Sequence, residues 1–478
     1  MNIKEFESEA EKVVGWMASY FENIEDFPVK ARVKPGEIKA GIPAFPPPQS
    51  EAFDDIMQDF REKILPGMTH WHNPNFFAYF PGNKSKPSVL AEMITAAMGA
   101  QCMSWITSPA ATELEERMME WLRDMIGLPG DFTGVIQDTA STATLCAILT
   151  AREKATNFSI NKHGFYGQKK FIVYSSKEVH SSIDKAVRIA GLGSENLRKI
   201  TVDKDFAMIP EALEDTIRLD IDKGYQPLCI ISAFGTTGST AIDPVAAISE
   251  ISKKYNIWHH VDAAYAGTAL ICPEYRELAA GADKADSFVF NPHKWMFTNF
   301  DCTAYFVRDP EALVNTFSET PEYLRTGEDN EVNNYRDWGI QLGRRFRALK
   351  LWFVIRNFGV EGLRQKLRGH MQMAIWLKEQ IERSDDFVLM APVPLNLVCF
   401  RYQPDRSLSQ GESNALNEKL MHILNDSGKL FMSHTKLNGF FTLRMVIGNT
   451  DVNEQHVHQA WDLIRKTARS LNISVITD

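Results

Sequence analysis

The chain has 478 residues, of which 44% are hydrophobic and 24% charged, a composition typical of a globular protein and unlike that of a disordered chain. Its net charge of −9 is unlike the positive charge of a typical nucleic-acid-binding protein. The sequence has no run of 18 apolar residues, so we predict no membrane span. Six scattered cysteines form no C-x-x-C pair, so we expect reduced thiols and a cytoplasmic protein.

The N-terminal region predicts a helical segment followed by two breaks. Residues 1–28 carry apolar side chains at the spacing of an amphipathic helix. The proline-rich stretch 43–48 is a stiff extended connector, and a second break lies at 81–87. We therefore divide the chain into an N-terminal helical segment (1–85), a large domain (86–355) and a small C-terminal domain (356–478).

In the large domain, short apolar runs alternate with longer helical stretches. The runs have the length of buried strands and lie at 171–174, 228–231, 257–261 and 287–290. Helical stretches between them include 210–223 and 244–254. This alternation predicts an α/β fold, a mostly parallel sheet covered by helices. After it, a long helical segment, apolar runs at 395–400 and 441–446 and a closing helix over about 452–470 predict a small α+β domain.

The strongest local signal is the sequence Asn-Pro-His-Lys-Trp at 291–295, directly after a predicted strand. Lys294 is either a lysine that snorkels at a strand end or an amine in a desolvated site. In such a site its pKa falls and it can form a Schiff base. The sequence contains no phosphate loop, complete dinucleotide fingerprint, zinc-protease helix or nucleophile elbow, and we predict no metal site.

Two further signals accompany the lysine. Asp262 ends a predicted strand, where it either caps the next segment or keeps a pyridine nitrogen protonated, as pyridoxal phosphate requires. Residues 137–144 place hydroxyl and small side chains at a helix start, which either caps that helix or binds a phosphate. Together with Lys294, these two features fit pyridoxal-phosphate chemistry better than any alternative chemistry that we considered.

With these motifs, the chain resembles the pyridoxal-phosphate-dependent aromatic-L-amino-acid decarboxylases, the group II amino-acid decarboxylases. The resemblance extends from about residue 10 to the C-terminal helix, and its most specific motifs lie at 70–72, 76–81, 108–115, 261–267, 291–295 and 342–346. It implies a fold type I (aspartate-aminotransferase-like) enzyme with a seven-stranded sheet. It also implies a homodimer with the active site at the subunit interface and the N-terminal segment packed on the partner.

The resemblance also assigns roles to residues. Lys294 is expected to carry the cofactor, Asp262 to pair with its pyridine nitrogen, His180 to stack on its ring and Tyr323 to act as the catalytic tyrosine of a mobile loop. Further cofactor contacts are implied at Ala264, Thr237, Ala140, Ser141, Asn291 and His293, and across the dimer at Phe300. Substrate contacts are implied at Trp71, Tyr79, Phe80, Met103, His180 and Gly343.

The composition of the loop that follows Tyr323 independently predicts that this loop is mobile. Residues 325–337 contain almost nothing to bury, so we expect them to open and close as a lid. In relatives with phenylalanine at the position of Tyr323, a carbanionic intermediate lives longer and reacts with oxygen to give an aldehyde. Tyr323 therefore favours simple decarboxylation.

The implied reaction is decarboxylation of an aromatic L-amino acid to its amine and CO₂. The candidate substrates are tryptophan, 5-hydroxytryptophan, tyrosine, phenylalanine and dihydroxyphenylalanine. Gly343 matches a position where glycine leaves room for an indole ring. Three alternatives remain: an aromatic aldehyde synthase or aminotransferase on this fold, a decarboxylase of a non-aromatic amino acid, and a catalytically silent cofactor-binding protein.

Overall fold

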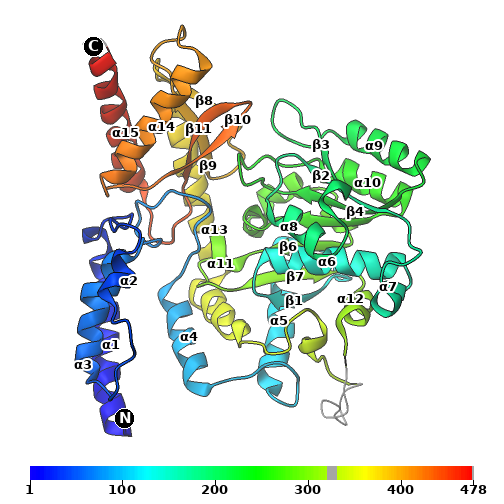
Figure 1. Ribbon diagram of the computed structural model, residues 1–478, viewed down its shortest axis with the longest axis horizontal. Helices are drawn as coiled ribbons and strands as arrows, with labels where there is room; N and C mark the ends of the chain where they lie inside the picture. Colours follow the sequence, from blue (N-terminus) through cyan, green and yellow to red (C-terminus); the bar gives the residue numbers. More distant parts are fainter. Residues whose placement is uncertain (320–330, 476–478) are drawn as a thin grey trace. The chain divides into compact units, whose positions relative to one another are not determined.

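The computed structural model describes residues 1–319 and 331–475, which form two compact units. The larger unit contains residues 82–375 and 391–399. The smaller unit contains residues 1–81, 376–390 and 400–478. None of the described helices combines the length and apolar character that a membrane crossing requires. Figure 1 shows the elements of both units along the chain.

A seven-stranded sheet forms the centre of the larger unit, in the order β1-β7-β6-β5-β4-β2-β3. Strands β2 to β6 pair in parallel, whereas β7 is antiparallel to both β6 and β1. The predicted mostly parallel sheet is thereby confirmed. The strands are β1 (Thr133–Gln137), β2 (Phe171–Ser176), β3 (Leu197–Ile200), β4 (Gln226–Ala233), β5 (Trp258–Asp262), β6 (Ser287–Phe290) and β7 (Thr303–Val307).

Helices cover both faces of this sheet, as Figure 1 shows. In β2, Phe171 and Val173 belong to the core that contains α6 and α8, whereas Ile172 and Tyr174 belong to the core with α9 and α10. Side chains of a strand alternate between faces, so an uninterrupted apolar run is buried on both sides. The helices of this unit are α4 (Lys86–Met98), α5 (Pro109–Ile126), α6 (Ala140–Ala155), α7 (Ser159–His163), α8 (Ser182–Ile189), α9 (Pro210–Asp222), α10 (Val245–Tyr255), α11 (Pro292–Trp295) and α12 (Pro310–Phe317).

The smaller unit combines the N-terminal helices with a four-stranded sheet in the order β10-β11-β9-β8. Helix α13 and strand β9 contribute residues to both units. The elements are α1 (Ile3–Glu22), α2 (Glu37–Gly41), α3 (Phe53–Asp59), α13 (Arg347–Glu382), β8 (Phe387–Leu389), β9 (Leu397–Tyr402), α14 (Gln410–Asp426), β10 (Ser433–Leu437), β11 (Phe440–Val446) and α15 (Glu454–Val475).

Strand direction brings the candidate site residues to one edge of the large sheet. Strand β1 is antiparallel to β7, and β7 is antiparallel to β6, so β1 runs in the same direction as the parallel strands. The carboxyl ends of β1, β2, β5 and β6 therefore lie along one edge, which is where ligands bind in open α/β sheets. His180 follows β2, Asp262 ends β5, and Lys294 follows β6.

Candidate active site

Lys294 lies in the single turn of α11, directly after β6. Burial lowers the pKa of its amine, while the negative charge of Asp262 opposes that shift. A lowered pKa makes more of the nucleophilic neutral amine available near neutral pH. A desolvated amine of this kind is what the Schiff-base interpretation of Lys294 requires.

The backbone around Lys294 is held by Asn83, a residue that no sequence motif had indicated. The Asn83 side-chain amide donates to the Lys294 carbonyl oxygen over 2.5 Å, and its backbone N–H donates to the His293 carbonyl oxygen over 2.8 Å. Asn83 is almost completely buried. It lies 211 residues from Lys294 in the sequence, so no local pattern could have linked the two.

Asp262 presents its carboxylate at the end of β5. Burial raises the pKa of this carboxyl group, and the Ala264 N–H, Lys294 and His180 act against that shift. Within the described residues, the Ala264 N–H is its one hydrogen-bond donor, at 3.1 Å. A carboxylate accepts several hydrogen bonds, so capacity remains for a further cationic N–H group.

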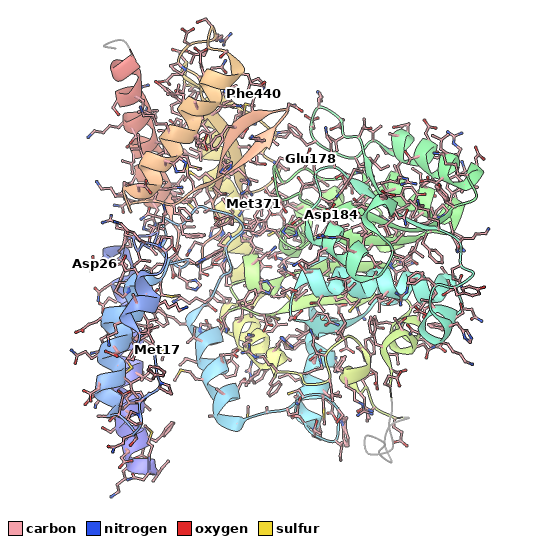
Figure 2. All side chains as sticks on the ribbon, in the orientation of Figure 1. Met17, Asp26, Glu178, Asp184, Met371 and Phe440 are labelled. Atoms are coloured by element: carbon pink, nitrogen blue, oxygen red, sulfur yellow. The ribbon has the colours of Figure 1, made fainter. Side chains whose placement is uncertain are left out.

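His180 lies in the loop between β2 and α8. Figure 2 labels Glu178 in this loop and Asp184 in the first turn of α8. Desolvation lowers the pKa of the imidazole, Asp262 raises it and Lys294 lowers it. The charges of Asp262 and Lys294 therefore act on the pKa of this ring in opposite directions. Its Nδ1 atom lies 2.8 Å from the Ser182 Oγ and accepts the Ser182 backbone N–H over 3.1 Å.

The start of α6 provides anion-binding donors. Thr139 is the N-cap, and its hydroxyl oxygen accepts the Thr142 N–H over 3.3 Å. The next residues, Ala140 and Ser141, are the first of the helix, where backbone N–H groups have no carbonyl partner within the helix. The carboxylate of Asp138 is occupied by the Thr139 N–H, at 2.5 Å.

Asn291, the N-cap of α11, and His293, in the single turn of that helix, extend this donor set. The backbone N–H of Cys302 donates to the His293 Nδ1 over 2.9 Å, so the neutral ring carries its proton on Nε2. Burial lowers the pKa of His293 to about 3. The ring is therefore a neutral N–H donor at physiological pH. The Asn291 amide oxygen lies 2.9 Å from the Thr303 hydroxyl, which fixes the amide orientation.

Four other predicted residues of the larger unit lie in its loops. Thr237 follows β4 and is exposed, in a turn where Gly235 adopts a φ of +91°. The ring centroids of Phe300 and His293 lie 4.6 Å apart, and Phe300 is 61% exposed. The Met103 carbonyl accepts the Arg336 N–H over 2.8 Å. A Cβ at Gly343 would lie 3.2 Å from the Gln101 Nε2.

The other three predicted substrate residues cluster in the smaller unit. The Trp71 and Tyr79 rings stack with centroids 5.6 Å apart, and the Arg444 guanidinium lies 5.4 Å from the Phe80 ring centroid. The Tyr79 backbone N–H and the Arg444 guanidinium both donate to the Ser433 hydroxyl oxygen, over 3.0 and 2.7 Å. The structure thus gathers these three aromatic residues into one cluster.

The lid prediction requires a correction. Tyr323 and the first part of the predicted lid lie outside the described residues. Asn334, Tyr335 and Arg336 are buried, contrary to the prediction that this segment has almost nothing to bury. The Asn334 amide oxygen accepts the Trp105 N–H over 3.1 Å, and the Arg344 guanidinium lies 4.8 Å from the Tyr335 ring centroid. These contacts anchor the end of the segment.

Comparison with known proteins identifies the family of this chain. The profile described as "Pyridoxal-dependent decarboxylase conserved domain" matches residues 35–403, more than half of the chain. The chain belongs to this family. As a member, it is an amino-acid decarboxylase, a carboxy-lyase, and pyridoxal phosphate is its cofactor.

Three individual relatives illustrate the likeness of this decarboxylase. Tyrosine decarboxylase 3 of Petroselinum crispum is 40% identical over 98% of the chain and 92% of the relative. Phenylacetaldehyde synthase of Arabidopsis thaliana is 42% identical over 96% of the chain and 95% of the relative. The crystal structure of Oryza sativa TDC with PLP and tryptamine has a TM-score of 0.95 at 36% identity, covering 98% of this chain and 99% of that one.

The donor set of this decarboxylase fits pyridoxal phosphate. The α6 start, Asn291 and His293 offer N–H groups to a phosphate, Asp262 has acceptor capacity for a pyridinium N–H, and Lys294 offers an amine to an aldehyde. When bound, the cofactor supplies an electron sink for charge that develops at the substrate Cα. The chemistry of these groups therefore agrees with the family assignment.

Proposed function

We propose that this decarboxylase converts aromatic L-amino acids to the corresponding amines and CO₂. The observation that carries the proposal is the placement of Asp262 at the end of β5 and of Lys294 just after β6, the neighbouring parallel strand, where the charge of Asp262 opposes the lowering of the Lys294 amine pKa by burial. The aromatic substrate class is supported by the relatives described above, among them a tyrosine decarboxylase and a structure with tryptamine.

Four residues would perform the chemistry. Lys294 would hold the cofactor until the substrate amine takes the place of the lysine amine. Asp262 would keep the pyridine nitrogen protonated, and its burial removes competing water. His180 would contact the cofactor ring and the substrate, and Tyr323 would deliver a proton to Cα. Water exclusion strengthens each of these electrostatic interactions.

The remaining predicted residues would bind the cofactor and the substrate. Ala140, Ser141, Asn291 and His293 would bind the phosphate, while Ala264 and Thr237 would contact the ring. Trp71, Tyr79 and Phe80 of the smaller unit are proposed as substrate contacts, and Met103 and Gly343 of the larger unit are each proposed for the same role. Gly343 favours an indole ring, because a larger residue would fill space beside Gln101.

Exposed apolar side chains support a homodimer with the active site at its interface. Helix α4 exposes Leu90, Ile94 and Met98, the first and last of which are 54% and 53% exposed. Phe300 is also exposed although its ring contacts His293. Such apolar surface on a single chain is typical of a buried subunit contact. Light scattering is expected to give about twice the 54.2 kDa chain mass, and a mass near 54.2 kDa would contradict it.

We also propose that the protein acts in the cytoplasm. All six cysteines lie in the described part of the chain as thiols without a disulfide bond, and each is buried. Unpaired cysteines are typical of reducing compartments. Microscopy of a fluorescent fusion would test this location, and an exclusively organellar signal would contradict it.

The test of the proposed function is turnover of an amino-acid panel. The holoenzyme is supplied separately with tryptophan, 5-hydroxytryptophan, tyrosine, phenylalanine, dihydroxyphenylalanine, glutamate and histidine, and amines are quantified by mass spectrometry. We expect amines from the aromatic substrates, with the indole substrates accepted because of Gly343. Turnover of glutamate or histidine with no aromatic amine would show that the substrate class is wrong.

A second candidate function is an aromatic aldehyde synthase. It is favoured by the 42% identity to phenylacetaldehyde synthase of Arabidopsis thaliana. The presence of tyrosine at position 323 argues against it. Measuring hydrogen peroxide and aldehyde beside the amine separates the two, because an aldehyde synthase consumes oxygen and releases both products.

A further inference from the structure

The contacts of His180 determine which of its ring nitrogens carries the proton. The Ser182 backbone N–H points at Nδ1 over 3.1 Å, and an N–H group can only donate. Nδ1 is therefore the accepting nitrogen, and the neutral ring carries its proton on Nε2. The Ser182 hydroxyl, 2.8 Å from the same Nδ1, must then also donate.

From this geometry we infer that Ser182 is a positioning residue, whose hydroxyl holds His180 in the neutral form that carries its proton on Nε2. The inference deepens the proposed function and rests on it, because it gives His180 a protonation state during decarboxylation. Ser182 is the first residue of α8, so its backbone N–H belongs to the positive end of that helix. Nothing in its local sequence marked it as functional.

A neutral donor suits a reaction that removes a carboxylate. Two donors on Nδ1 oppose protonation there, because an added proton would break both hydrogen bonds. The charged groups that act on the ring within the described residues are Asp262, which favours the imidazolium, and Lys294, which opposes it. A ring kept neutral can donate from Nε2 to a substrate carboxylate without the full positive charge that would stabilise that group against loss as CO₂.

The test compares three variants of the holoenzyme. Ser182→Ala removes the hydroxyl donor, Ser182→Thr retains it, and Ser181→Ala is the matched control, because the Ser181 side chain makes no capping hydrogen bond. Losing one donor to Nδ1 favours the imidazolium, so the acid limb of the kcat/KM profile is expected to move up by about 0.7 pH unit in Ser182→Ala, about fivefold in the neutral fraction. Ser182→Thr and Ser181→Ala should keep the original limb.

A second measurement needs no substitution at Ser182. Proton–nitrogen spectra of the wild-type holoenzyme with ¹⁵N-labelled histidine report the tautomer of each ring, and His180→Asn identifies the His180 signal by its loss. We expect an unprotonated Nδ1 and a protonated Nε2. A protonated Nδ1, or an acid limb that Ser182→Ala leaves unchanged, would overturn the inference. These spectra do not depend on the substrate, so failure of the proposed function would be seen separately, as absence of aromatic amine.

Discussion

Replacing Lys294 with alanine is expected to lower amine production by about a thousandfold or more, in line with the removal of a covalent catalytic group in other enzymes. Burial lowers the pKa of the Lys294 amine, and the charge of Asp262 opposes that shift. Alanine retains no group that can join the cofactor aldehyde. Treatment with borohydride should therefore leave no covalent cofactor on the variant, whereas the wild-type enzyme should keep it through dialysis.

Peptide mapping gives this prediction its control. Lys350 is a second buried lysine of the larger unit, and burial lowers its pKa to about 8. Its amine lies 3.0 Å from the Glu92 carboxylate, with which it forms an ion pair. We expect the reduced cofactor on the peptide that contains Lys294 and none on the peptide with Lys350. A cofactor mass on any other lysine of the wild-type enzyme would contradict the assignment.

Changing Tyr323 to phenylalanine is expected to alter the product as well as the rate. The variant lacks the hydroxyl that would deliver a proton to Cα. After CO₂ has left, Cα should therefore stay unprotonated for longer and react with oxygen. Amine yield should fall by about a hundredfold or more, which is the range for loss of a general acid. Aldehyde and hydrogen peroxide should rise together, while the absorbance of the bound cofactor remains.

Tyr335→Phe is a suitable comparison for this substitution. Tyr335 is buried near the end of the same loop, with Arg344 over its ring, and no role in proton transfer is assigned to it. It should retain the amine as product. If Tyr323→Phe gave the wild-type yield of amine without peroxide, the proton would come from another group, and the proposed role of Tyr323 would be wrong.

Much of the large sheet could be predicted because its strands are apolar on both faces. The runs within β2 and β4 are buried from end to end or nearly so, which leaves a continuous hydrophobic pattern. Strand β1 lacks that pattern. It contains Gly134, where a Cβ would lie 2.3 Å from the Met119 Cε and 2.9 Å from the Phe306 ring, so any larger residue would have to displace these side chains. A strand selected for that contact is not recognisable from hydrophobic runs.

Some residues of the site could likewise be recognised from the local sequence, whereas others depend on contacts with distant parts of the chain. Lys294 follows one predicted strand and Asp262 ends another, so both residues could be identified as candidates from the sequence. Asn83 and the Cys302 N–H hold the loop and the His293 ring through contacts that depend on the folded chain. The burial of Asn334 was missed for the same reason, because its partner Trp105 lies 229 residues away.

Decarboxylation of L-tryptophan in D₂O tests the central claim most directly. Loss of CO₂ from Cα followed by one proton transfer gives tryptamine with a single deuterium at Cα. We predict one such molecule per CO₂ released, with no hydrogen peroxide, and no deuterated amine from Lys294→Ala. Indole acetaldehyde formed with ammonia and peroxide, or the absence of any tryptamine from an enzyme that retains its cofactor, would contradict the account.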